Sequence, residues 1–122
     1  MAEMFNNPAR DVALPVPETG TLNLNAQTLE WLPSGTEGFW VKPLFESDVD
    51  RLKTWLMKVD PGAYSPMHAH EEIEQIYVIE GSFYDQHETY GPGQMIVRAP
   101  GAEHEAGSKT GGLMMVSYAP KV

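Results

Sequence analysis

The chain has 122 residues, enough for a single domain with its own core, and its 42% hydrophobic content argues against global disorder. A formal net charge of −9 disfavours nucleic acid and anionic membrane surfaces as partners, because both are bound by clustered lysine and arginine. The absence of cysteine excludes disulfides and thiolate ligands, and without a secretory signal or an apolar run of roughly 20 residues we expect a cytoplasmic protein with no membrane partner.

The N-terminal segment, residues 1–20, is punctuated by proline and glycine and shows no hydrophobic period. We expect an arm there that is either disordered or lies across a neighbouring subunit. The rest of the chain, residues 21–122, is expected to form one domain, because no repeat or internal linker interrupts it. Its first candidate strands are short and cover residues 21–25 and 28–32.

Short strands separated by turn signals follow along the chain. Residues 39–45 predict an edge strand, because Pro43 cannot donate a hydrogen bond to a neighbouring strand. Residues 51–59 alternate, with Trp55, Met57 and Val59 on one face. Further strands are expected over residues 72–80, 94–99 and 112–119, with a hairpin of residues 82–85 and 88–90. No long segment shows a helical period, so the pattern predicts an all-β domain of the jelly-roll or a related barrel type.

Three of the four histidines lie in two clusters, and the fourth, His87, falls in the predicted hairpin turn, where we expect it to be solvated. His68, His70 and Glu74 are separated by even intervals, so on a regular extended strand they would face the same side. His104 follows a Pro-Gly turn that would aim it from another strand into the same interior. Because imidazole and carboxylate groups together suit divalent metals, these four residues are predicted to form a metal site.

The simpler interpretation of these residues is that they bind nothing. A single histidine is more often a surface or satisfied core residue, and a glutamate on a strand usually faces solvent. Glu74, however, shares its parity with Ile76 and Val78, so it lies in an apolar register. An unpaired carboxylate there would be costly, which favours coordination or pairing of this side chain.

At this point the chain resembles the cupin family, whose two sequence motifs carry the metal ligands. The first motif has every gap satisfied, by Gly62, His68, His70, Glu74 and Gly81. The second is matched at Gly93, Gly101 and His104, although Ala99 and Ser108 replace its proline and asparagine. The resemblance implies a double-stranded β-helix, the cupin jelly-roll barrel. Residues 38–44 and 54–56 also resemble the ChrR-type subfamily, which includes acetylacetone-cleaving dioxygenases.

The resemblance implies a metal-dependent dioxygenase acting on a small enolisable and chelating compound of the β-diketone type. Fe²⁺ is the metal expected of such an enzyme, and Zn²⁺, Mn²⁺ or Ni²⁺ also suit the ligands. Glu74 departs from the diketone-cleaving relatives, which use three histidines without a carboxylate. Two alternatives stay open: a zinc-binding sensory or structural module of the ChrR type, and a non-redox isomerase or lyase acting on a sugar acid. Cupins commonly pair, so a homodimer is expected.

Other residues are softer candidates for a role at the site. Four could form the wall of a substrate pocket, although barrel cores often use such side chains as filler: Tyr64, Met57, Ile76 and Met95. Glu74 and Glu103 are candidates for a catalytic base, with Glu103 placed beside His104. For Glu103 the alternative is an ordinary turn carboxylate in solvent.

Overall fold

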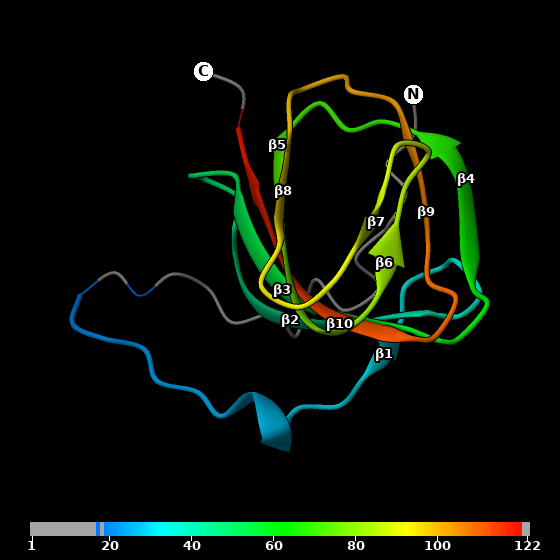
Figure 1. The fold of residues 1–122 in the computed structure, drawn as a ribbon. Helices are drawn as coiled ribbons and strands as arrows, with labels where there is room; N and C mark the ends of the chain where they lie inside the picture. Colours follow the sequence, from blue (N-terminus) through cyan, green and yellow to red (C-terminus); the bar gives the residue numbers. More distant parts are fainter. Residues whose placement is uncertain (1–16, 18, 121–122) are drawn as a thin grey trace.

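Two antiparallel sheets form the part of the chain described by the computed structural model, which is Pro17 and residues 19–120. The larger sheet has the order β1-β2-β3-β10-β5-β8 and contains β1 (Leu32–Pro33), β2 (Phe39–Ser47), β3 (Leu52–Val59), β10 (Gly112–Ala119), β5 (Ile73–Gly81) and β8 (Met95–Arg98). The smaller sheet has the order β4-β9-β6-β7 and contains β4 (Tyr64–His68), β9 (His104–Gly107), β6 (Phe83–Tyr84) and β7 (Thr89–Tyr90). β5 and β8 stand on one side of the barrel and β4 and β9 on the other (Figure 1). The expected all-β jelly roll is confirmed.

Alternating side chains from both sheets fill the barrel. On β3 the residues Trp55, Met57 and Val59 are buried, as the alternation predicts. On β5 the buried residues are Glu74, Ile76 and Val78, so the carboxylate does lie in the apolar register. The hydrophobic core comprises Phe39, Val41, Trp55, Met57, Val59, Ile76, Val78, Phe83, Ile96, Ala106, Met114, Val116 and Tyr118.

The start of the described chain differs from expectation. Of the two strands predicted over residues 21–25 and 28–32, only Leu32 is in a strand, and Ala26–Thr28 forms a 3₁₀ turn instead. Asn25 explains the difference, because its side-chain oxygen accepts a backbone N–H of the turn at 2.9 Å. Such local side-chain bonds compete with strand pairing. The predicted arm, residues 1–20, lies outside the described residues except for residues 17, 19 and 20.

Strand β2 was predicted as an edge strand, but the two-residue strand β1 lies outside it and is the edge of the sheet. β1 pairs with β2 only at Trp40 and Val41, so it does not pair with Pro43. On the inner side of β2, the ladder with β3 shifts register between Pro43 and Phe45. Among residues 19–120, no helix approaches the length and apolarity that a membrane span requires.

Two glycines of the first motif allow a direct test of backbone constraints at the barrel end. Gly62 and Gly81 have φ angles of 84° and 74°, a region that disfavours residues with a Cβ. A Cβ at Gly81 would collide with the carbonyl oxygen of Gly111, whereas one at Gly62 would meet nothing within 4 Å.

We therefore expect Gly62→Ala to cost about 1–2 kcal/mol from the left-handed backbone alone. Gly81→Ala should cost about 1–3 kcal/mol more, because the backbone between β5 and β10 must also shift. Urea denaturation of both variants at one temperature measures the difference. Equal destabilisation would contradict the packing seen at Gly81.

Candidate metal centre

His68 and His104 face each other from paired strands of the smaller sheet. His68 is the last residue of β4, His104 is the first residue of β9, and the two are register partners. Their ring centroids are 4.2 Å apart, and the ring of His70 lies 5.3 Å from that of His68. Each of the three imidazoles offers a nitrogen, and these nitrogens all lie within 4.8 Å of one another. The structure therefore brings the three predicted histidines together.

The route to this convergence is not the one predicted. β4 ends at His68 and β5 begins only at Ile73, so His70 lies in the connection and Glu74 on the next strand. The connection is tied down because the backbone N–H of Gly101 donates to the carbonyl oxygen of His70 at 2.7 Å. Closure of the barrel, and not the parity of one regular strand, brings the predicted ligands together.

Backbone carbonyls fix the orientation of two of the imidazoles. Nδ1 of His68 lies 2.7 Å from the carbonyl oxygen of Pro66, and Nδ1 of His104 lies 3.1 Å from that of Ala102. Because a carbonyl only accepts, each Nδ1 carries the proton and each Nε2 presents a lone pair. Metal-binding histidines commonly donate their other ring N–H in this way.

Burial keeps these imidazoles in the neutral form that binds metals. It lowers the pKa of His68 below the ordinary value, and it lowers the pKa of His104 to about 4, with Glu74 opposing and Arg98 adding to the shift at both residues. Nε2 of His68 is buried and has no hydrogen-bond partner among the described residues. A buried polar atom left in that state costs about 1–3 kcal/mol, and a divalent cation would satisfy it. The donor set therefore fits a metal ion.

Glu74 lies beside the cluster, on β5, which runs between β10 and β8 in the larger sheet. It is 1% exposed, with Oε2 at 3.4 Å from Nε2 of His70 and Oε1 at 3.6 Å from Nε2 of His104. Oε2 accepts a hydrogen bond from the Tyr118 hydroxyl at 2.7 Å, and Oε1 accepts one from Nε of Arg98 at 3.2 Å. Each carboxylate oxygen keeps a second lone pair with which it could bind a metal ion. The role of Glu74 as fourth ligand stays a prediction.

The two partners of Glu74 come from the strands on either side of it. Arg98 on β8 and Tyr118 on β10 are its register partners. Arg98 also donates through Nη1 to Oδ2 of Asp85 at 3.0 Å, and the Tyr90 hydroxyl donates to the same oxygen at 2.9 Å. The site is thus continuous with a buried network of charges.

Asp85 is an anion at neutral pH within this network. Burial acts to raise its pKa, but hydrogen bonds from two backbone N–H groups of the turn, from Tyr90 and from Arg98 outweigh burial, so the pKa lies below the ordinary value. Burial and the bond to Asp85 raise the pKa of Tyr90 to about 12. The positive charge of Arg98 therefore lies between two carboxylates.

Sequence reasoning missed Arg98, Asp85 and Tyr118. The available signal was parity: Arg98 lies two residues from Ile96, which is buried. That signal was ambiguous, because both alternating faces of residues 94–99 carry apolar side chains. Only the register between β5 and β8 places Arg98 opposite Glu74.

Two of the softer candidates are not brought to the cluster. Tyr64 is 48% exposed and Met95 is 54% exposed. The ladder between β4 and β9 is irregular between Ser65 and His68, which breaks the parity that linked Tyr64 to the histidines. On β8 the buried positions are Ile96 and Arg98, so Met95 points out of the barrel.

The remaining candidates lie in the core or in solvent, as the simpler interpretations of these residues predict. Met57 and Ile76 are fully buried members of the hydrophobic core. Glu103 is exposed, and the bond that Nδ1 of His104 makes goes to a backbone carbonyl instead. His87 is exposed in the hairpin turn, as expected.

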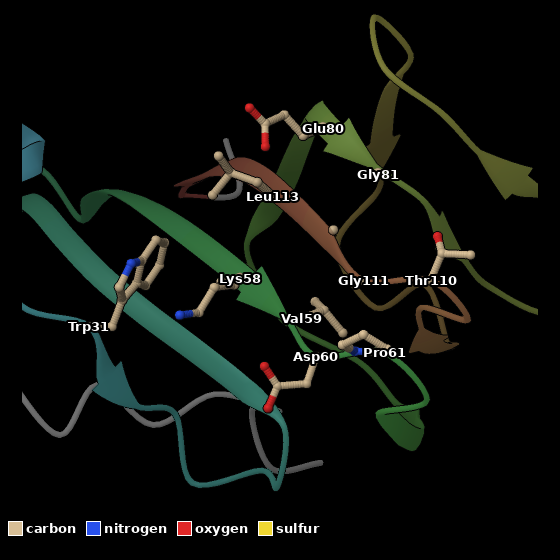
Figure 2. Close-up of a pocket in the computed structure, with 11 residues that line it drawn as sticks. Trp31, Lys58, Val59, Asp60, Pro61, Glu80, Gly81, Thr110, Gly111 and Leu113 are labelled. Carbon is tan, nitrogen blue, oxygen red and sulfur yellow. The ribbon is translucent and has the colours of Figure 1, made fainter.

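An open pocket lies at the other end of β10 from Tyr118 (Figure 2). Its walls include Trp31, Lys58, Asp60, Pro61, Glu80 and Thr110. The ammonium group of Lys58 lies 5.0 Å from the centroid of the Trp31 ring, so this cation already has an aromatic partner. The pocket contains none of the three histidines, and we assign it no part in the metal site.

The jelly-roll fold and the clustered histidines together define a cupin with a site able to hold a metal ion. Residues 19–122 match the family described as ChrR Cupin-like domain, and the chain belongs to that family. A comparison with curated proteins gives no match.

Solved structures share the fold at low sequence identity. An RmlC-like cupin from Shewanella frigidimarina is 23% identical with a TM-score of 0.73, over 84% of this chain and 93% of that one. The anti-sigma factor ChrR of Rhodobacter sphaeroides, solved with SigE, is 19% identical with a TM-score of 0.63, over 78% of this chain and 50% of that one. A candidate acetylacetone dioxygenase from Methylibium petroleiphilum is 14% identical with a TM-score of 0.74, over 85% and 80%.

Proposed function

We propose that the protein is a metal-dependent dioxygenase acting on a small enolisable and chelating oxygenated compound, such as a β-diketone. The observation that carries the proposal is the convergence of His68, His70 and His104, with Nδ1 of His68 and of His104 bonded to carbonyls and each Nε2 lone pair left for a metal ion. A divalent ion there would act as a Lewis acid towards two substrate oxygens and, as Fe²⁺, would supply electrons to dioxygen.

The protein groups have separate tasks in this proposal. The carbonyls of Pro66 and Ala102 hold two imidazole rings in place, which limits reorganisation on metal binding. Three imidazoles, with or without one carboxylate oxygen, leave positions open on a six-coordinate ion for a bidentate substrate. Arg98 offsets the charge of Glu74, which lessens the repulsion that this carboxylate would exert on an anionic enolate.

The fold likeness to the Methylibium protein supports this choice as an analogy. A dioxygenase transfers both atoms of dioxygen to its products, so a carbon–carbon bond of the diketone breaks and no external reductant is consumed. Dioxygen uptake should therefore match substrate loss one for one.

The test is to load the protein with Fe²⁺ under anaerobic conditions and to record oxygen-electrode traces with a panel of β-diketones and flavonols. We expect uptake by the wild type and by His87→Ala, which removes an exposed imidazole, but not by His104→Ala. If the wild type consumes no more dioxygen than His104→Ala with every compound, the oxygenase proposal is wrong.

A second candidate is a zinc-binding sensory or structural module, which the match to the ChrR Cupin-like family favours. In that case Zn²⁺ would be held by four protein ligands in a closed tetrahedron, with Glu74 as the fourth. X-ray absorption of the Zn²⁺ protein separates the two: four protein ligands with no solvent favour the module, and five or six ligands including solvent favour the enzyme.

Two further expectations stay proposals. A sugar-acid isomerase or lyase would convert its substrate without dioxygen, so sugar acids belong in the same panel under nitrogen. The homodimer is tested by sedimentation velocity, which gives a mass of two chains if the proposal holds and one if it does not.

A further inference from the structure

Arg98 joins the candidate metal centre to the β6–β7 hairpin. It is 9% exposed, with Nε at 3.2 Å from Oε1 of Glu74 and Nη1 at 3.0 Å from Oδ2 of Asp85. Because the guanidinium is planar and rigid, fixing two of its nitrogens fixes the direction of the whole group.

The hairpin end of this connection is itself immobilised. Oδ1 of Asp85 accepts two backbone N–H groups of the turn, at 2.8 and 3.0 Å, and Oδ2 accepts the Tyr90 hydroxyl at 2.9 Å. Asp85 accepts four hydrogen bonds in all, and none of them comes from a histidine of the cluster. It therefore anchors Arg98 without touching the histidines through these bonds.

The other end of the connection is the carboxylate of Glu74, and Arg98 holds the oxygen that faces His104. Oε1 of Glu74 lies 3.2 Å from Nε of Arg98 and 3.6 Å from Nε2 of His104. The same oxygen therefore accepts a hydrogen bond from the arginine and lies next to a nitrogen of the histidine cluster. Holding that oxygen removes rotamer freedom which a glutamate side chain would otherwise lose only on binding metal.

We propose that Arg98 is a positioning residue of the metal centre: anchored by Asp85, it holds the carboxylate of Glu74 towards the histidines and so sets metal affinity and ligand geometry. The proposal rests on the metal site of the proposed function but not on the oxygenase reaction. A loss of oxygenase activity alone leaves it untouched.

A competing account treats Arg98 only as a positive charge. A fixed cation near the cluster repels a divalent ion, so its removal would tighten metal binding. Positioning predicts the opposite sign, because losing the partner of a ligand typically weakens metal binding about 10–100-fold. Lysine at this position separates the two, since it keeps the charge but cannot donate to both carboxylates from one rigid plane.

The experiment measures Zn²⁺ affinity by chelator competition and records the visible absorption bands of the Co²⁺ protein. We expect Arg98→Lys and Arg98→Met both to weaken Zn²⁺ binding about 10–100-fold and to shift the Co²⁺ bands. Arg51→Met, at an exposed arginine, is the matched control and should change neither. Unchanged or tighter binding in both Arg98 variants, with wild-type bands, would overturn the proposal.

A double-variant cycle shows whether Arg98 acts through Glu74. In a Glu74→Gln background, Arg98→Lys should cost little further affinity, because the oxygen to be positioned has lost its charge. Full additivity of the two changes would contradict the proposal. If the Arg98 variants fail to fold, Asp85→Asn decides: it keeps an oxygen for the turn but weakens the anchor, so unchanged affinity and bands would then count as the refutation.

Discussion

Replacing His104 with alanine is expected to weaken binding of Zn²⁺ or Co²⁺ by more than about 100-fold, beyond the loss typical for a hydrogen-bonded partner of a ligand. His104 supplies one of the nitrogens that lie within 4.8 Å of one another, and its Nδ1 is already engaged by a carbonyl. Its Nε2 has the lone pair required of a ligand, and alanine offers no side-chain donor in its place. Competition against a chelator of known affinity measures the change.

The matched control for this prediction is His87→Ala. This variant also removes one imidazole from the chain, but the imidazole is exposed in the hairpin turn. Its metal affinity should equal that of the wild type, which shows that total histidine content does not decide binding. Circular dichroism confirms that both variants are folded. Equal affinities for His104→Ala and the wild type would remove His104 from the site.

Saturating the protein with Zn²⁺ is expected to raise its thermal midpoint by about 10 °C or more. At a free concentration of about 100 times Kd, a ligand that binds only the folded state stabilises it by about 2.7 kcal/mol, which at this chain length corresponds to a shift of that size. The metal would also satisfy Nε2 of His68, which is buried without a hydrogen bond among the described residues.

Calorimetry of the metal-free protein and of protein with excess Zn²⁺ measures this shift. The shift should persist in His87→Ala and disappear in His68→Ala at the same metal concentration. A shift of equal size in His68→Ala would mean that the cation stabilises the fold from another site. An absent shift in the wild type would mean that the cluster binds no metal tightly in the folded state.

Much of the barrel was predictable because burial follows strand alternation. Trp55, Met57 and Val59 occupy one parity and form core, as the sequence indicates. Glu74 was recognisable by the same rule, since a carboxylate in an apolar register needs a partner. The histidines were predictable from their spacing, although the assumed regular strand was wrong because β4 ends at His68.

The partners of Glu74 could not be predicted, because they depend on register between strands distant in sequence. Arg98 and Tyr118 are 24 and 44 residues away from Glu74. No local pattern marks either of them as a neighbour of a metal site, and Asp85 is recognisable locally only as a turn residue. Their roles follow from the pairing of β8, β5 and β10, which is a property of the folded sheet.

Anomalous diffraction at the metal absorption edge, from crystals grown with Zn²⁺ or Co²⁺, tests the central claim most directly. The account predicts one strong peak per chain, at roughly 2.0–2.2 Å from a nitrogen of each of His68, His70 and His104. A peak at a different place on the chain, or no peak between the three imidazoles, would contradict it.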